Sequence, residues 1–401
     1  SCGNLAGVAY DEFEHCIING NISLSLTEKK NVDAPVFPVP DTSDFTAASS
    51  VLDSQLAGYA AEMKELGAPA LSGEAVFPVL FHAFARNGII PNFKSQKEGY
   101  SNIHWACAAG AALQYGTQLW NCVDMWHKLT YPGHTAQEMY QNLVFAWFAG
   151  VDRVYTEAVS AFFDSNDDYN ETGRLFTQFC NEYRGRDRGY TVRDYKPEIG
   201  IIRADDGYWG QNNIHVSYFG WRNILLNNPK LRGGAKNREW IQAIETITQG
   251  DTRLTGISWG RITPWSMLIP HRSFCTMNGL AVFDEFVRKE TLKTLNVAFL
   301  CGETISGATL RDVDELVREN GLIAVTSPRF APADVLSQAD GRYSEIRRGE
   351  GKYIITDDFA SPKLKKSLDI TLGNKGEIAL KFKGKKIRLK VDPDGNGFRQ
   401  V

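Results

Sequence analysis

The first 190 residues alternate short apolar runs with longer segments in which apolar residues recur at helical spacing. The helical segments include residues 45–67 and 75–88, and each of these two ends in a glycine, which is a common helix stop. Strands that alternate with helices pair in parallel, because each helix carries the chain back to the same edge of the sheet. The five runs that predict strands are Tyr10–Glu14, Ala70–Glu74, Ile89–Glu98, Thr117–Trp126 and Asp152–Glu157.

Acidic side chains recur where these predicted strands end. In a closed parallel barrel the active site is built at the carboxyl ends of the strands, so acids at these positions indicate chemistry. A single acid there has a second explanation, since Asp and Glu also favour the first turn of the helix that follows. Aromatic residues stand close to the acids, at Trp120, Trp126 and Tyr155. Carboxylates beside aromatic rings suit a carbohydrate, whose ring has an apolar face and whose hydroxyls bind acids.

A complete (β/α)8 barrel needs eight strands, and this zone predicts five. If the strand that ends at Glu157 is the last of the barrel, then "AYDEFE" holds the fourth, and the first three precede Ser1. We therefore expect residues 1–190 to be the C-terminal part of a barrel. The missing strands would come from a longer protein or from an N-terminal fragment that stays bound.

The second zone, residues 196–340, predicts a doubly wound α/β domain of flavodoxin-like type. A buried strand, "IGIIR", is followed later by a strand, an amphipathic helix and a strand in residues 295–327. No G-x-G-x-x-G follows the first strand, so a dinucleotide cofactor has little support, and we predict no cofactor.

The third zone, residues 341–401, predicts a small antiparallel β-sandwich. Its short apolar runs are "KYIITDD", "KSLDITLG", "EIALKFKG" and "KKIRLKV", with turn pairs at Gly373-Asn374 and Asp394-Gly395. Alternating lysines in the last two runs are most simply the wet face of a sheet.

The composition of the chain argues against several classes of function. The net charge is −3 with dispersed basic residues, which argues against a nucleic-acid partner, and no run of 18 apolar residues exists to span a membrane. Seven cysteines without a C-x-x-C pair suggest neither a disulfide framework nor a zinc site, and the histidines lack the spacing of metal ligands. We predict no metal. The compartment stays open between the cytoplasm and the periplasm or exterior.

Three stretches resemble the family 42 β-galactosidases, which are clan A glycoside hydrolases. Residues 132–159 resemble the last barrel helix, an Ala-Gly turn and the final strand, whereas residues 199–211 and 296–327 resemble strands and a helix of the second domain. The order of barrel, α/β domain and small β-sandwich also matches. The resemblance implies a carbohydrate substrate and a homo-oligomer, with a trimer formed through the second domain.

The resemblance also implies which carboxylates act. Family members place the acid/base after the fourth strand and the nucleophile after the seventh, about 5 Å apart. These positions correspond to Glu12, with Glu14 as its rival, and to Asp124. The family has a glutamate where this chain has Asp124, so Glu98 on the neighbouring strand is a second candidate, and an inverting mechanism stays open. Glu157 and Asn121 would orient the sugar, with Trp120, Trp126 and Tyr155 beside it.

The sequence thus predicts a glycoside hydrolase that uses two carboxylates, an exo-acting retaining β-glycosidase such as a β-galactosidase. A second interpretation is a catalytically inactive carbohydrate-binding or assembly protein, because the expected nucleophile glutamate is replaced. A third is an amidotransferase-like hydrolase with Cys301 as nucleophile, since this thiol ends a predicted strand before Gly302.

Overall fold

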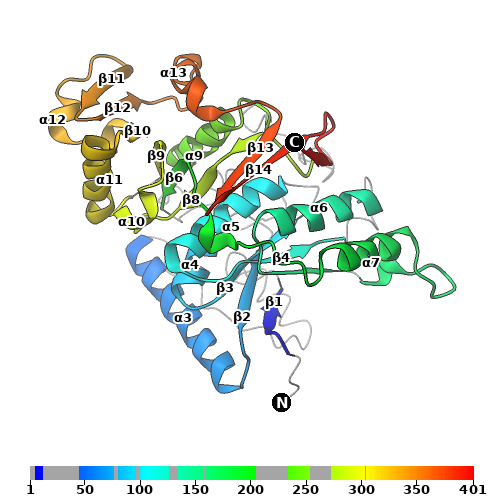
Figure 1. Ribbon diagram of the computed structural model, residues 1–401. Helices are drawn as coiled ribbons and strands as arrows, with labels where there is room; N and C mark the ends of the chain where they lie inside the picture. Colours follow the sequence, from blue (N-terminus) through cyan, green and yellow to red (C-terminus); the bar gives the residue numbers. More distant parts are fainter. Residues whose placement is uncertain are drawn as a thin grey trace.

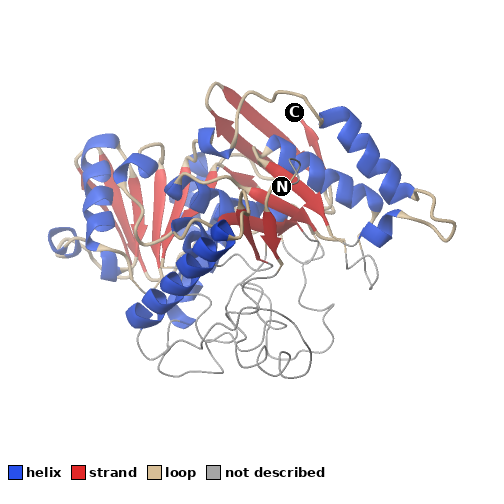
Figure 2. Cartoon of the chain, turned by 90° about the horizontal axis from the view of Figure 1, so that it is seen from below, coloured by secondary structure: helices blue, strands red, loops and turns tan. Residues whose placement is uncertain are grey.

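The strands of the described residues assemble into three sheets, and Figure 1 shows their arrangement. The computed structural model describes residues 5–11, 45–75, 80–95, 100–125, 134–157, 159–204, 234–252, 272–302 and 304–401. Seen from below, the six-stranded sheet lies at the left end of the molecule and the two other sheets lie to its right (Figure 2). None of the helices within these residues combines the length and the apolar composition needed to cross a bilayer.

The first sheet holds five strands that pair in sequence order, and every neighbouring pair is parallel. The predicted alternation of strands and helices is therefore confirmed, and the curled sheet corresponds to part of a (β/α)8 barrel. The strand β2 keeps its predicted length and shifts by one residue, whereas the other four strands are shorter than predicted, and the first ends at Tyr10, before the acids of "DEFE". The strands are β1 (Val8–Tyr10), β2 (Leu71–Ala75), β3 (Ile90–Ser95), β4 (Trp120–Val123) and β5 (Arg153–Thr156).

Helices follow these strands and cover the sheet. Helix α6 begins with a capping box, in which Thr135 and Glu138 each bind the backbone N–H of the other. Helix α5 is rich in small residues, and a Cβ at Gly110 would lie 1.7 Å from the carbonyl oxygen of Val282 in the second sheet. This close approach joins the two parallel sheets. The helices are α3 (Phe45–Glu65), α4 (Phe81–Arg86), α5 (Ser101–Tyr115), α6 (Ala136–Phe148) and α7 (Glu171–Tyr183), with 3-10 turns η2 (Val159–Phe162) and η3 (Val192–Asp194).

The second sheet has the order β11-β12-β10-β9-β6-β8, in which all neighbours except β11 and β12 are parallel. Numbered along the chain, its parallel strands stand in the order 2-1-3-4-5, an order found in doubly wound sheets. The strands are β6 (Ile199–Arg203), β8 (Leu280–Phe283), β9 (Val297–Cys301), β10 (Ile323–Thr326), β11 (Tyr343–Arg348) and β12 (Gly351–Thr356). Its helices are α9 (Gly234–Ile247), α10 (Lys289–Leu292), α11 (Gly307–Asn320), η7 (Pro328–Phe330) and α12 (Ala333–Leu336).

The third sheet differs from the predicted sandwich of residues 341–401. It has four strands in the order β15-β14-β13-β7, and β7 comes from the middle of the chain and pairs in parallel with β13. The run "KYIITDD" belongs instead to the second sheet, as β12. The strands are β7 (Met277–Asn278), β13 (Glu377–Phe382), β14 (Lys385–Val391) and β15 (Phe398–Gln400).

The run "KSLDITLG" forms a helix, α13 (Pro362–Leu372), where we predicted a strand. Leu368, Ile370 and Leu372 alternate with polar residues, which favours a strand. Leu364, Leu368 and Leu372, however, are spaced by four and are buried on one helical face, and Ile370 is 98% exposed. The Ser361 hydroxyl caps the first turn, and Pro362 occupies its first position. The spacing of the buried leucines and the N-terminal capping residues therefore favour a helix over a strand here.

Aromatic side chains from all three zones share one core. Trp105 of α5 lies 4.9 Å from Tyr195 and 6.1 Å from Phe145, measured between ring centroids. Phe274 in turn contacts both Phe145 and Phe398, at 5.4 and 5.1 Å. The zones that the sequence separates are therefore packed as one body.

Candidate active site

Several carboxylates surround a buried lysine at the carboxyl end of the first sheet. Lys94 is next to the last residue of β3, and its side chain is 1% exposed. Among the residues that the structure describes, its Nζ lies within ion-pair distance of four acids, one from the end of each other strand of this sheet. The distances are 2.7 Å to Glu157 Oε2, 2.9 Å to Glu74 Oε1, 3.4 Å to Asp124 Oδ2 and 3.5 Å to Asp11 Oδ1. We call these five residues the Lys94 cluster.

Parallel pairing explains why acids so far apart in sequence meet. The strands run in the same direction, so their carboxyl ends lie at one edge, and alternate residues of each strand point to the same face. Glu74 and Asp124 are buried with Lys94, at 2% and 1% exposure, whereas the Glu157 and Asp11 side chains are 34% and 66% exposed. The cluster is thus closed in the middle of the sheet and more open at its two outer strands.

A layer of polar side chains supports the cluster from below. The Tyr155 hydroxyl donates to Glu74 Oε2 at 2.5 Å and accepts from Asn92 Nδ2 at 2.7 Å. Asn92 also lies 3.4 Å from the Ser72 hydroxyl. Ser72, Asn92 and Tyr155 each stand two residues before a member of the cluster, so they face the same side. Burial raises the pKa of the Tyr155 phenol, which stays protonated and donates to the carboxylate.

The charges of the Lys94 cluster do not balance within the described residues. One ammonium faces four carboxylates, and three of these five groups are almost fully buried. Repulsion between the carboxylates favours the binding of a hydrogen-bond donor.

A metal ion has a poor fit here. Glu74, Cys122 and Glu157 bring three donor atoms within 4.8 Å of one another. The Lys94 ammonium contacts both of these carboxylates, so it occupies the place of a cation. Burial also raises the pKa of the Cys122 thiol, which keeps it protonated.

The structure brings together some of the predicted residues. Asp124 and Glu157 lie in the Lys94 cluster, and Tyr155 lies directly beneath it. Asn121 is fully buried in the wall of the sheet, where its amide binds the Phe93 carbonyl at 2.8 Å and the Ser95 hydroxyl at 3.0 Å. The remaining predicted residues Glu12, Glu14, Glu98 and Trp126 lie outside the described residues.

Trp120 stands at the other end of its strand from the carboxylates. It is the first residue of β4, four positions before Asp124, and only 5% of it is exposed. Its ring lies 5.4 Å from the Arg153 guanidinium, and its indole N–H donates to Gln118. The expectation that Trp120 lies beside the acids rests on its closeness to Asp124 in the sequence.

Sequence reasoning did not select Lys94 and Glu74 as site residues. Glu74 was recognised only as one of the recurring strand-end acids. Lys94 lies inside an apolar run, but it follows Asn92 by two positions. A pair of polar residues at period two inside a strand indicates a polar inner face, and this signal could have found it.

Cys301 lies elsewhere, at the end of β9 in the second sheet. Its side chain is fully buried, and burial raises the pKa of the thiol well above its usual value. A nucleophilic cysteine needs the thiolate, so these surroundings disfavour the amidotransferase-like reaction.

Comparison with solved structures supports the predicted resemblance of the fold. The chain aligns with a β-galactosidase from the Antarctic haloarchaeon Halorubrum lacusprofundi over 96% of this chain and 71% of that chain, at 9% identity and a TM-score of 0.55. It aligns with the β-galactosidase from Bacillus circulans sp. alkalophilus over 87% and 62% of the two chains, at 10% identity and the same TM-score. The GH42 β-galactosidase Gan42B aligns over 86% and 61%, at 8% identity and a TM-score of 0.44.

These likenesses concern the fold. No family model and no curated protein matches the sequence. The chain spans about two thirds of the length of the first two galactosidases, and its fold, with a partial parallel barrel, is similar to theirs.

Proposed function

We propose that this chain is a glycoside hydrolase whose chemistry is carried out in the Lys94 cluster. The observation that supports the proposal is the convergence of carboxylates from four strands at the carboxyl edge of a sheet with a β-galactosidase fold. This edge is where parallel barrels carry their active sites. The reaction needs two carboxyl groups and no cofactor.

Asp124 is our candidate for the nucleophile. Its carboxylate lies 3.4 Å from the Lys94 ammonium, and a neighbouring positive charge favours the ionised form that attacks the anomeric carbon. The acid that protonates the glycosidic oxygen would come from the β1 side, from Glu12 or from its rival Glu14. Water would then hydrolyse the glycosyl-enzyme, with the acid acting as base. This assignment describes an exo-acting retaining β-glycosidase such as a β-galactosidase.

Glu157 is our candidate for sugar binding. Its carboxylate is one-third exposed and is held by Lys94 at 2.7 Å, so one oxygen can accept from a sugar hydroxyl while the other is fixed. Lys94 then positions both the nucleophile and this acceptor.

The test is hydrolysis of a panel of aryl glycosides by the purified protein and by Asp124→Asn. We expect the substitution to lower kcat/KM on the order of 10³-fold, because the amide cannot form the glycosyl-enzyme. Asp369→Asn, on the exposed face of α13, removes the same charge and should behave as wild type. Equal activity of the Asp124 and Asp369 variants would refute the assignment of the nucleophile.

A specific observation favours a second function, a sugar-binding protein without hydrolysis. The position that holds glutamate in the family holds the shorter Asp124, and its carboxylate is paired with a buried lysine. Sugar binding without turnover on any glycoside, unchanged by Glu12→Gln, would support it. The predicted homo-oligomer and the bound N-terminal fragment stay part of either proposal.

A further inference from the structure

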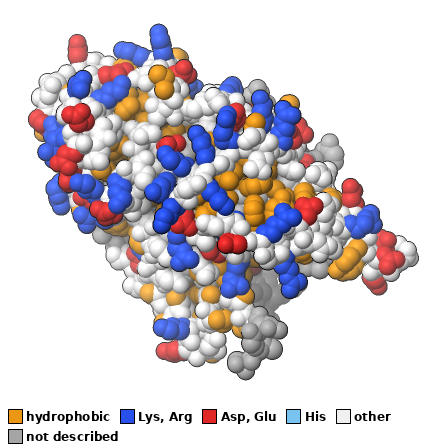
Figure 3. Space-filling view, viewed as in Figure 1, with side chains coloured by type: hydrophobic (Ala, Val, Ile, Leu, Met, Phe, Trp, Pro, Cys, Tyr) orange, Lys and Arg blue, Asp and Glu red, His pale blue; other side chains and the backbone are white. Residues whose placement is uncertain are grey.

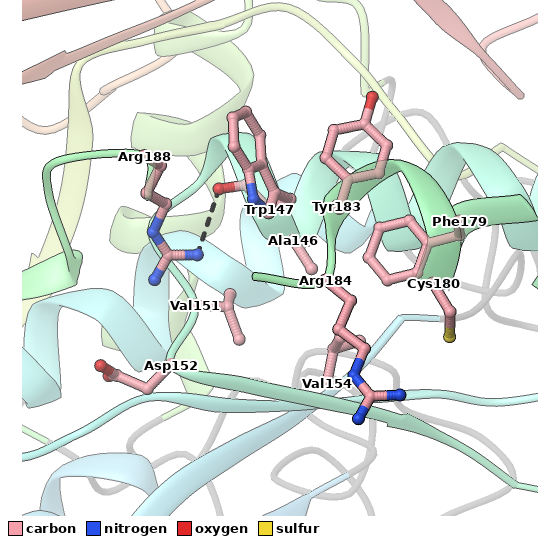
Figure 4. A pocket seen from close by; sticks show the side chains of 10 residues that line it. All are labelled: Ala146, Trp147, Val151, Asp152, Val154, Phe179, Cys180, Tyr183, Arg184 and Arg188. Carbon is pink, nitrogen blue, oxygen red and sulfur yellow. Dashed lines mark hydrogen bonds between the residues drawn. The ribbon is translucent and has the colours of Figure 1, made fainter. Parts of the chain in front are cut away.

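A hollow of about 310 Å³ lies between α6, β5 and α7 (Figure 4). It adjoins the residues that enter β5, so it is at the opposite end of this strand from Glu157 and the Lys94 cluster. Its size is at the lower end of the range for small-molecule sites. The lining residues are Ala146, Trp147, Val151, Asp152, Val154, Phe179, Cys180, Tyr183, Arg184 and Arg188.

One part of this α6–α7 hollow is apolar and aromatic. Val151 and Val154 lie below, and the rings of Trp147 and Tyr183 stand 4.9 Å apart at 54°. Both rings are only partly buried in the protein core. In the space-filling view, apolar side chains gather on the face that carries α6, with lysines and arginines around them (Figure 3). The hollow thus offers ring surface to a ligand.

The other part of the hollow offers both hydrogen-bond acceptors and donors. Asp152 is fixed, because one carboxylate oxygen accepts from the Leu119 N–H at 2.9 Å. Arg188 is fixed as well, since its guanidinium donates to the carbonyls of Tyr190 and Trp147 at 2.7 and 3.4 Å. Arg184 lines the hollow from the exposed end of α7. A carboxylate and two guanidinium groups therefore surround an apolar floor.

We propose that the α6–α7 hollow binds a neutral sugar ring, as a carbohydrate site separate from the Lys94 cluster. A pyranose has an apolar C–H face for the aromatic and valine side chains. Its hydroxyls donate to Asp152 and accept from the arginines, a combination that few small ligands provide. A simple organic anion would suit Arg184 and Arg188 but would be repelled by Asp152. Sugar binding in this hollow depends on the residues that line it and does not require that the protein hydrolyses glycosides.

The test measures sugar binding to the whole chain by calorimetry and ligand-observed NMR. The probes are methyl glycosides of galactose, glucose, mannose, xylose and N-acetylglucosamine. Arg184→Ala should weaken binding of the preferred sugar about tenfold, because a charged hydrogen bond is lost. Arg186→Ala is the matched control: the guanidinium of this exposed arginine lies 5.6 Å from the centroid of the Tyr183 ring, and Arg186 does not line the hollow. It should retain the wild-type affinity.

A second variant, Asp152→Asn, keeps an oxygen for the Leu119 N–H and should also weaken binding about tenfold. Hydrolysis, if present, should be unchanged by Arg184→Ala, and Asp124→Asn should leave the arginine-dependent binding intact. The two proposals can therefore fail separately. Absence of saturable binding to every glycoside, equal affinities for the Arg184 and Arg186 variants, or binding of benzoate in place of sugars would each overturn the inference.

Discussion

Two parallel sheets of this protein place charged side chains at the carboxyl ends of their strands, and they balance the charges differently. In the second sheet Glu239 accepts from Arg329 at 2.6 Å and from the Gly302 N–H at 3.1 Å, and Arg329 also donates to the Gly302 carbonyl. This carboxylate thus has its own guanidinium. In the first sheet four carboxylates of the described residues share Lys94.

The difference distinguishes an ion pair that stabilises the fold from a cluster of charged groups that can act on a ligand. A carboxylate with a dedicated partner needs nothing more from a ligand, and the Glu239–Arg329 pair is explained by the packing of α9 on the sheet. Two buried carboxylates and two partly exposed ones around one ammonium are costly to hold together, and sites that keep such a cost are commonly functional. The comparison therefore supports the first sheet as the place of the proposed chemistry.

The largest effect is expected from Lys94→Met. It leaves Glu74 and Asp124 buried without the shared ammonium, so we expect a loss of about 3 to 5 kcal/mol in the free energy of unfolding at pH 7, measured with urea. Protonation of the carboxylates should restore part of this loss at acidic pH. Lys381→Met breaks an exposed pair with Glu198 and should cost under about 1 kcal/mol. Similar losses in both variants would contradict a buried cluster.

The next effect concerns His104, whose ring nitrogen lies 3.3 Å from the Lys94 carbonyl. Burial lowers the pKa of His104 to about 3 from its usual 6.5, so the unfolded chain binds the proton first as the pH falls. This group therefore removes about 1.4 kcal/mol of stability per pH unit between about pH 6 and pH 3. His104→Gln should remove that slope from unfolding curves measured across this range. Ser101→Ala, a buried change on the same helix, should keep it.

The smallest effect is expected in the second sheet. Burial raises the pKa of Glu239 although Arg329 opposes the shift, so the folded protein holds this proton more tightly than the unfolded chain. The advantage of wild type over Glu239→Gln should then decrease as the pH rises above about 4.5. An advantage that grows with pH would mean that the ion pair outweighs its desolvation. Glu290→Gln, at an exposed pair, should show no such trend.

Much of the first sheet could be predicted because its pattern is local. Helix α6, the Gly150 turn and β5 stand where the spacing of apolar residues and the glycine place them. The convergence of carboxylates on Lys94 could not be predicted from such a local pattern. It depends on the register of five strands, and a shift of one residue in any of them would turn an acid to the other face.

The third zone shows where local pattern fails. Alternation in "KSLDITLG" fits a strand, yet the leucines upstream complete a helical face that the core buries. The partner of β13 is β7, about 100 residues earlier, and no property of residues 341–401 indicates it. Pairings over such separations follow from the packed core.

The step from β7 to β8 has a consequence for dividing this protein into parts. Met277–Asn278 pairs in the third sheet, Leu280–Phe283 pairs in the second, and between them Gly279 has a φ of 66°. The short stretch of residues 277–283 therefore contributes one strand to each of two sheets. A truncation after residue 340 would strip β11 and β12 from one sheet and leave β7 without β13. The C-terminal sheet is therefore not a module that can be exchanged by itself. Expression and engineering should keep the residues on both sides of Gly279 in one chain.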